Sequence, residues 1–524
     1  MFRSSFLNKS IFMFRVISFF FAILFFSFPA IAQVVIKGNA KEFQGKNVVV
    51  YSVADYVSSK NNVLLTRNIA SDGSFKVDLD IADTRAVIIA IPPYQGLMYV
   101  EPGKNYEIVF PGNDKSEVRR FDKSEVALEF VNIPGDDLNV LIRQFNSDYF
   151  KFLNEHYYDF AVGEYRGSDV VKNRMAEKNQ GVDLYKRAGA DTSKVANVTS
   201  GFGNVITNFY NDTQLKYGEH YKNLFFADYV KYSLAEIELI AGRSKKSFYN
   251  EYFMSQPLLL QNPAYMKCLG LFYNNFLGTR PKDLQSGITK AISVERNGSQ
   301  LVKMLENDSI ALGNRIRTVA VIRSLKEFYF DKRYPRTAVE ACLRELSQNA
   351  EDDDLKEMAK NTVSVLNNGR EGWMPDDFVL ADEQNNLWKW SENKGAYTYF
   401  IFFATWSSAS VKEMLLLEKL NEQYKDYVRI VAINMDDDHE LFQKYIREHK
   451  NQKFEFLFGN GDILLRDKLN IKSIPYALMV NPEGAAMFDY TRKPGEGIQS
   501  DFEKIKQLAA SNPTQGPKTW KKKQ

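Results

Sequence analysis

The sequence has little of the chemistry that builds metal or thiol sites, since its 524 residues include only four histidines and two cysteines. His156, His220, His439 and His449 stand at no spacing typical of a metal site, so neither a metal nor another cofactor is expected. Beyond residue 32 the chain also lacks any apolar stretch near the roughly 20 residues that span a bilayer. We therefore expect no transmembrane anchor in the mature protein.

The first 32 residues have the composition of a cleaved export signal. They hold three basic residues, no acidic residue, an apolar run over 16–28 and the small-residue exit Ala30-Ile31-Ala32. We predict that residues 1–32 are removed and that the mature protein starts at Gln33. No cysteine stands near the exit, which excludes lipid attachment there. A periplasmic or otherwise exported protein is expected.

Loss of that segment changes the charge balance. The chain has 68 basic and 65 acidic residues, so removal of the three basic residues leaves 65 of each sign. A net charge near zero argues against nucleic acid or an anionic membrane surface as the main partner. With 44% hydrophobic residues the chain is expected to be globular, and its length suits about three domains.

The two cysteines, Cys268 and Cys342, each lie in a helical pattern. An even number of cysteines in an exported protein permits one disulfide, whereas two buried thiols that pack as small apolar side chains fit the same pattern. A bridge needs Cα atoms within roughly 7 Å, which spacing in the sequence does not reveal. Both alternatives stay open at this stage.

Residues 33–133 predict a β-rich N-terminal domain. Turn signals such as Ser71-Asp72-Gly73 and Pro102-Gly103 separate short apolar or alternating runs. Several short strands at such spacing favour a small antiparallel sandwich. The predicted strands are 34–38, 47–51, 74–77, 86–90 and 106–110.

Residues 134–368 predict an all-α middle region. The apolar period becomes helical after Pro134-Gly135, and His156 falls on the apolar face as an expected core residue. Near the end of this region two amphipathic segments, 337–348 and 353–366, resemble a helical hairpin of α-solenoids, although no fixed repeat period is present.

Residues 369–512 predict an α/β domain, because buried strands alternate with helical patterns. A basic tail at 513–524 follows and is expected to be disordered. The predicted strands are 397–404, 428–434, 454–458, 476–480 and 486–490, with helices at 411–424, at 439–449 and at the end of the domain.

Three motifs in this stretch resemble the thioredoxin superfamily, and within it the exported TlpA-like branch. They are the lead-in from Pro375 to Phe378, the strand-to-helix corner Ala404-Thr405-Trp406 and the loop Ser473-Ile474-Pro475. The three-part layout also resembles some exported thioredoxin-like proteins of Gram-negative envelopes. The resemblance implies a thioredoxin fold with a cis-proline loop, and a surface for an extended peptide at Trp406, Ser407, Ile474 and Pro475.

One departure from that family decides the expected function. Members of this branch that exchange disulfides carry C-x-x-C directly after the tryptophan, where the helix N-terminus lowers the thiol pKa. Here those two positions are Ser407 and Ser410, and Cys268 and Cys342 lie outside the domain. A hydroxyl forms no disulfide, so we predict that the domain is redox-inactive. Ser407 lacks a base in any nearby motif and is expected to cap the helix rather than to attack a substrate.

The sequence therefore predicts a non-catalytic binding or scaffolding module for an envelope protein or an extended peptide. The alternative is an enzyme, a thiol-disulfide oxidoreductase of the TlpA-like type, which the resemblance alone would suggest. A rigid spacer without a partner at the corner is the third hypothesis. The sequence does not name the partner or the oligomeric state.

Overall fold

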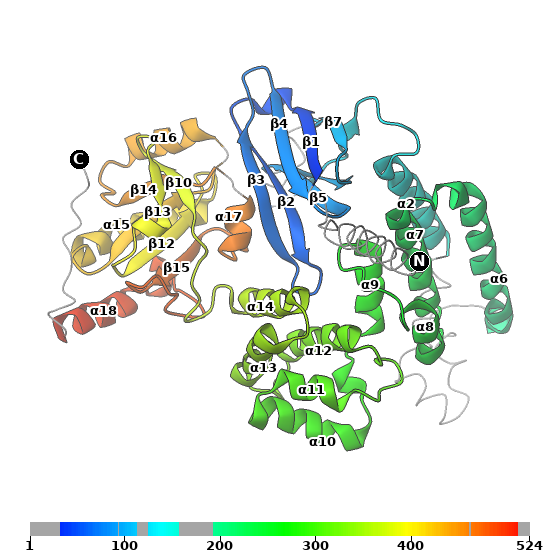
Figure 1. Cartoon of the computed structure of the whole chain (residues 1–524). Helices are drawn as coiled ribbons and strands as arrows, with labels where there is room; N and C mark the ends of the chain where they lie inside the picture. The colour runs from blue at the N-terminus through cyan, green and yellow to red at the C-terminus, as the bar shows by residue number, and fades with distance from the viewer. Residues whose placement is uncertain are drawn as a thin grey trace, which may run out of the picture.

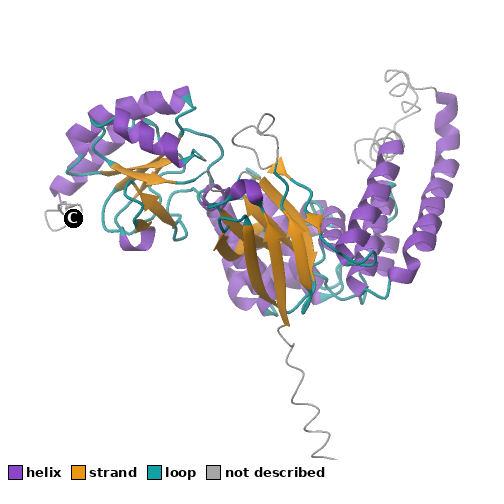
Figure 2. Cartoon of the chain, turned by 90° about the horizontal axis from the view of Figure 1, so that it is seen from above, coloured by secondary structure: helices purple, strands orange, loops and turns teal. Residues whose placement is uncertain are grey.

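The computed structural model describes residues 32–92, 94–112, 124–156, 192–436, 438–460 and 463–511. The predicted signal, apart from Ala32, and the predicted basic tail lie outside the described residues. The chain folds as a β-rich N-terminal region, a helical middle and an α/β C-terminal domain (Figure 1 and Figure 2), which confirms the predicted fold types and their order. Among the described helices, none has the length and apolar character needed to cross a membrane.

The β-rich region consists of two sheets that share one core. Alternating apolar residues of both sheets, such as Val34, Ile36, Val50 and Ile89, are fully buried between them. The first sheet has the strand order β4-β1-β7-β9 and the second has the order β3-β2-β5-β6-β8. The strands are β1 (Ala32–Asn39), β2 (Asn47–Asp55), β3 (Lys60–Asn68), β4 (Ser74–Ile81), β5 (Arg85–Ile91), β6 (Tyr94–Val100), β7 (Asn105–Val109), β8 (Ser124–Glu125) and β9 (Glu129–Phe130), with the 3-10 turn η1 (Lys41–Phe43) after β1.

All five strands predicted in this region are present, but β3, β6 and the two-residue strands β8 and β9 were not predicted. Strand β3 is an edge strand with mostly polar, exposed residues, so its sequence lacks a clear alternation. The sandwich also differs from a purely antiparallel one, because β1 pairs in parallel with β7 and β6 pairs in parallel with β8.

The middle region is helical throughout its described part. Asn or Asp side chains cap several helix starts, as Asn223, Asn262 and Asp352 do for α7, α9 and α14. The α-helices are α2 (Leu138–Glu155), α6 (Thr192–Tyr217), α7 (Leu224–Ile240), α8 (Lys245–Tyr252), α9 (Pro263–Phe272), α10 (Lys282–Lys290), α11 (Gly298–Met304), α12 (Asn314–Phe328), α13 (Arg336–Asn349) and α14 (Asp353–Asn367). Shorter turns are η2 (Gly218–His220), η3 (Leu277–Thr279) and the π-helical η4 (Ala291–Glu295).

The structure settles the state of the two cysteines. Cys268 on α9 and Cys342 on α13 are both fully buried free thiols. They belong to the large apolar core of the middle region, so they pack as small hydrophobic side chains. His156 is the C-cap of α2, where its ring lies 4.8 Å from that of Phe152 and is only half-buried.

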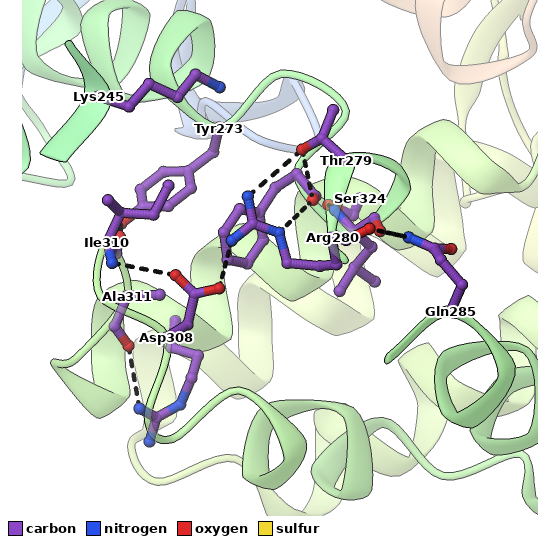
Figure 3. A network of polar contacts seen from close by, with 12 residues as sticks. Lys245, Tyr273, Thr279, Arg280, Gln285, Asp308, Ile310, Ala311 and Ser324 are labelled. Carbon is purple, nitrogen blue, oxygen red and sulfur yellow. Dashed lines mark hydrogen bonds and ion pairs between the residues drawn. The ribbon is translucent and has the colours of Figure 1, made fainter. Parts of the chain in front are cut away.

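A polar network fastens the loops on either side of α10 and α11 (Figure 3). Arg280 forms an ion pair with Asp308, and both side chains are about nine-tenths buried. The Asp308 carboxylate also accepts the N–H of Ile310 at 3.0 Å, and Gln285 donates to the carbonyls of Leu277 and Arg280. These bonds satisfy backbone groups of irregular segments that the core would otherwise leave unpaired.

The C-terminal domain is one six-stranded sheet of order β11-β10-β14-β13-β12-β15, with helices on both faces. Strands β12, β13 and β14 are parallel, whereas β15 runs antiparallel to β12 and β10 runs antiparallel to β14. The elements are β10 (Val379–Asp382), β11 (Leu387–Lys389), η5 (Trp390–Glu392), β12 (Thr398–Phe403), α15 (Ser408–Tyr424), β13 (Arg429–Asn434), α16 (His439–Glu448), β14 (Glu455–Phe458), α17 (Ile463–Lys468), β15 (Tyr476–Val480), η6 (Pro494–Glu496) and α18 (Gln499–Ser511).

The predicted strand at 486–490 is wrong. Ala486 forms a single bridge with Val480, the N–H of Met487 donates to the Met479 carbonyl at 2.9 Å, and the segment then leaves the sheet. The physical reason lies at Met479, whose N–H donates to the Thr491 hydroxyl at 3.0 Å instead of to a neighbouring strand. The hairpin β10–β11 and helix α17 were not predicted at all, because each is too short to show a clear period.

Side chains also join the three regions to one another. Lys326 on α12 donates to the Val57 carbonyl at 2.7 Å, across to the β-rich region. Arg370, which follows α14, lies 5.2 Å from the Tyr329 ring and 3.6 Å from the Asp489 carboxylate. The C-terminal domain is thereby held against the end of the helical middle.

Candidate functional site

The sheet register brings the two predicted motifs of the C-terminal domain together. Phe402 on β12 pairs with Tyr476 on β15, so the residues before Tyr476 lie beside the residues after Phe402. The Ile474–Pro475 peptide bond is cis, as the resemblance predicted. The Ile474-Pro475 loop therefore adjoins the corner that leads from β12 through Trp406 into α15.

Ser407 occupies the N-cap of α15. Its hydroxyl accepts the backbone N–H of Ser410 at 3.2 Å, and its own N–H donates to the Ala404 carbonyl at 3.1 Å. This is the capping role that the sequence predicted, because Ser satisfies an N–H group that the first turn leaves unpaired. The side chain of Ser407 is only half-buried, so it borders the surface of the corner.

Ser410 lies one helical turn further in and is fully buried. Its hydroxyl has no hydrogen-bond partner within the described part of the chain. A buried polar group without a partner costs free energy, so nothing in the packing favours a hydroxyl at this position.

The outer part of the site is partly apolar. Trp406 has 40% of its surface exposed, although it is a large aromatic residue. Ile474, Pro475 and Tyr476 are half-buried, and Ile474 packs on the core beneath the loop. An exposed aromatic ring beside a half-buried apolar loop is suited to contact with another chain.

Asp436 is a buried carboxylate beneath the corner, and it was not predicted as part of the site. Asp436 follows β13 and is 1% exposed, and both of its oxygens lie 3.2 Å from the Thr405 nitrogen. Asn434 donates to the same carboxylate at 2.8 Å. The signal that would have found Asp436 is its place after a parallel strand, since neighbouring parallel strands end at the same sheet edge.

No base faces Ser407 in the described part of the chain. The nearest histidine in the sequence, His439, begins α16, where its ring packs against those of Phe442 and Phe458 at 5.9 and 5.0 Å. Without a base in contact, the hydroxyl of Ser407 has no group to take its proton. The geometry of these residues provides a helix cap rather than a nucleophile.

The two thiols of the chain lie outside the C-terminal domain, and their burial makes them unreactive. Burial raises the pKa of Cys342 to about 12, and burial raises the pKa of Cys268 as well. The thiolate is the reactive form of cysteine, so both side chains are held in the inert form at neutral pH.

Comparison with known proteins identifies the C-terminal domain. Residues 395–486 match the model of a family described as thioredoxin-like. The chain is 24% identical, over 134 residues, to the thiol-disulfide oxidoreductase ResA of Halalkalibacterium halodurans, an alignment that covers 25% of this chain and 75% of that protein.

The C-terminal domain is also similar to domains of solved structures. A putative thiol-disulfide oxidoreductase from Bacteroides vulgatus is 21% identical and covers 26% of this chain and 96% of its own, with a TM-score of 0.24. The C-terminal domain of a putative thiol-disulfide oxidoreductase from Bacteroides thetaiotaomicron is 19% identical and covers 27% and 99%, with a TM-score of 0.25. The family match over residues 395–486 and the alignment with ResA show that the domain is thioredoxin-like and related to thiol-disulfide oxidoreductases.

Proposed function

We propose that the C-terminal domain is a redox-inactive binding module, which holds an extended peptide or an envelope protein against Trp406, Ser407, Ile474 and Pro475. The observation that carries the proposal is the occupancy of the α15 N-terminus by Ser407 and Ser410. The TlpA-like proteins that exchange disulfides carry cysteines there, and a hydroxyl neither attacks a disulfide nor stores electrons.

The retained geometry supports binding without chemistry. The corner and the cis-proline loop lie side by side, Asp436 fixes the Thr405 N–H, and Trp406 is exposed. A platform of this kind contacts an extended chain through exposed apolar side chains and strand-like backbone groups. The buried thiols in the helical middle take no part.

The same proposal assigns the protein to the periplasm after removal of residues 1–32. Its supports are the basic, apolar and small-residue order of that segment and the relationship to thiol-disulfide oxidoreductases. N-terminal sequencing of the protein recovered from the periplasmic fraction should begin at Gln33. Recovery of the uncleaved chain from the cytoplasm would contradict this part of the proposal.

Site-specific photo-crosslinking in cells tests the binding role. A crosslinking residue replaces Ser407, and a control chain carries it at Asp72, in the exposed turn before β4. One species captured at position 407 but not at position 72, and lost with Trp406→Ala, is the expected result. Equal capture at both positions would leave the domain as a rigid spacer.

A reductase assay separates the module from the rival enzyme. The purified protein should not reduce insulin disulfides in the presence of dithiothreitol beyond the uncatalysed rate. Activity that disappears in the double variant Cys268→Ser/Cys342→Ser would show that this chain is an oxidoreductase after all. The double variant is also the control for contaminating reductase, since a contaminant's activity survives in it.

A further inference from the structure

A second surface, away from the corner, lies between the β-rich region and the C-terminal domain. Here a cleft of about 480 Å³ separates the five-stranded sheet from the β10–β11 hairpin and α17. Val49 and Val63 line one wall, and Val379 and Leu387 line the other. Figure 1 shows α17 on the side of the C-terminal domain that faces β3. The volume is within the range of sites that hold ligands.

Three of the apolar residues that line this cleft are exposed to solvent. Leu387 is 83% exposed, Val379 is 49% exposed and Val63 is 37% exposed. They come from two different domains and face one common space, so they form a joint apolar surface rather than scattered single residues.

The charge in the cleft has one sign. Lys46 and Lys468 line it, and none of its described lining residues is Asp or Glu. Lys468 reaches only the Asp377 carbonyl, at 3.5 Å, and Lys46 lies 6.0 Å from the Phe43 ring. Within the described residues neither ammonium group has a carboxylate partner, so both are available to an anionic ligand.

The cleft also adjoins two strands that end their sheets. Strand β3 is the outermost strand of the five-stranded sheet, and β11 is the outermost strand of the six-stranded sheet. Val63 on β3 and Leu387 on β11 both line the cleft. An edge strand offers unpaired N–H and C=O groups to an added strand, which favours an extended peptide over a compact ligand.

We propose that this cleft binds an extended peptide segment in which apolar residues alternate with acidic ones. The apolar side chains of the peptide contact Val63, Val379 and Leu387, and its carboxylates pair with Lys46 and Lys468. Alternation suits an extended strand, because successive side chains point to opposite faces. This proposal is independent of the corner around Trp406 and would stand if the corner bound nothing.

Fluorescence anisotropy with a labelled peptide tests the proposal on the whole purified protein. The probe is a short capped peptide that alternates valine with glutamate, and the comparison probe has lysine in place of each glutamate. The variant Lys46→Glu/Lys468→Glu reverses the charge of the cleft, and Leu387→Ser removes an apolar contact at an exposed position. Lys303→Glu, on the exposed face of α11, lowers the net charge by two rather than four and is the control for added negative charge outside the cleft.

The acidic probe should bind the unaltered protein and Lys303→Glu equally. Its affinity should fall about tenfold or more in the double variant, and clearly in Leu387→Ser, because charge complementarity and apolar contact are both lost. The lysine probe should instead bind more tightly to the double variant than to the unaltered protein. Equal binding of both probes, or binding lost in Trp406→Ala but kept in the cleft variants, would overturn the proposal.

Discussion

Asn139 on α2 pairs with the backbone of Tyr99 on β6 as a neighbouring strand residue would. Its side-chain oxygen accepts the Tyr99 N–H at 2.7 Å, and its side-chain nitrogen donates to the Tyr99 carbonyl at 2.9 Å. Both residues are buried, and Asp137 accepts from the Asn139 backbone N–H at 2.8 Å. One amide thus attaches the first helix of the middle region to the β-rich region.

Replacement of Asn139 by Ala should lower the free energy of unfolding by about 2–4 kcal/mol. The variant leaves a buried N–H and a buried C=O of Tyr99 without partners, and each unsatisfied group costs about 1–3 kcal/mol. Urea unfolding monitored by circular dichroism measures the change. Asn208→Ala, at an exposed position on α6, is the control and should change stability by less than about 0.5 kcal/mol.

Ser407 and Ser410 should respond in opposite ways to replacement by Ala. Ser407→Ala removes the cap of α15 and should cost about 1 kcal/mol of stability. Ser410→Ala removes a buried hydroxyl that has no partner and should leave stability unchanged or raised by about 1 kcal/mol. Thermal unfolding of the two variants side by side tests this. A larger loss in Ser410→Ala than in Ser407→Ala would show that the buried hydroxyl has a partner.

The ion pair between Arg280 and Asp308 should matter far more than an exposed pair. Asp308→Ala leaves a guanidinium group about nine-tenths buried without its carboxylate, which should cost about 3–5 kcal/mol. Asp353→Ala removes the fully exposed partner of Lys356 and should cost less than about 1 kcal/mol. Chemical denaturation curves give both values. Similar losses in the two variants would contradict the importance of the network in Figure 3.

Buried tyrosines should make the fold sensitive to alkaline pH. Burial raises the pKa of Tyr445 to about 12, and burial together with Tyr229 raises the pKa of Tyr56 to about 12. An unfolded tyrosine titrates near 10. The stability that each group contributes is therefore fully present below pH 10 and is lost as pH rises from about 10 to 12, by up to about 1.4 kcal/mol per pH unit for each tyrosine.

Tyr445→Phe checks that relationship. The variant loses its ionisable hydroxyl, so its free energy of unfolding should fall less steeply between pH 10 and 12 than that of the unaltered protein. At neutral pH it should be slightly less stable, because the Gln452 side chain loses the hydrogen bond that it accepts at 3.1 Å. If the free energy of unfolding fell equally steeply with pH in both proteins, the raised pKa of Tyr445 would be refuted.

Much of the fold was open to prediction because local patterns were strong. The helix expected at 353–366 is found at Asp353–Asn367, where Asp352 caps it and its apolar residues face the core. The strand expected at 397–404 is found at Thr398–Phe403, since a continuous apolar run suits a strand buried on both faces. Long segments with a regular apolar pattern can be predicted from the local sequence alone.

The elements that were missed or wrongly predicted share one physical cause, because each depends on contacts with residues that are far away in the sequence. Strand β3 is mostly polar and becomes a strand only by pairing with β2. The segment after Ala486 should have continued as a strand by its pattern, but the Thr491 hydroxyl occupies the Met479 N–H. A hydrogen bond that competes with a strand pair cannot be read from propensity alone.

For the candidate site, the sequence by itself determined which functional groups stand at the start of α15. The resemblance to disulfide-exchanging thioredoxin-like proteins predicts that Ser407 and Ser410 take the places of their two cysteines, and a hydroxyl forms no disulfide, which is the basis of the redox-inactive module that we propose. The sequence also gave the order of the corner and the proline loop along the chain.

Only the tertiary structure decided which of these residues are neighbours in space. The pairing of Phe402 with Tyr476 joins the corner to the loop, and the adjacent end of β13 places Asp436 beneath Thr405. Packing of the helical core keeps Cys268 and Cys342 as buried free thiols. Contacts between residues far apart in sequence depend on the packing of whole domains, which local composition does not encode.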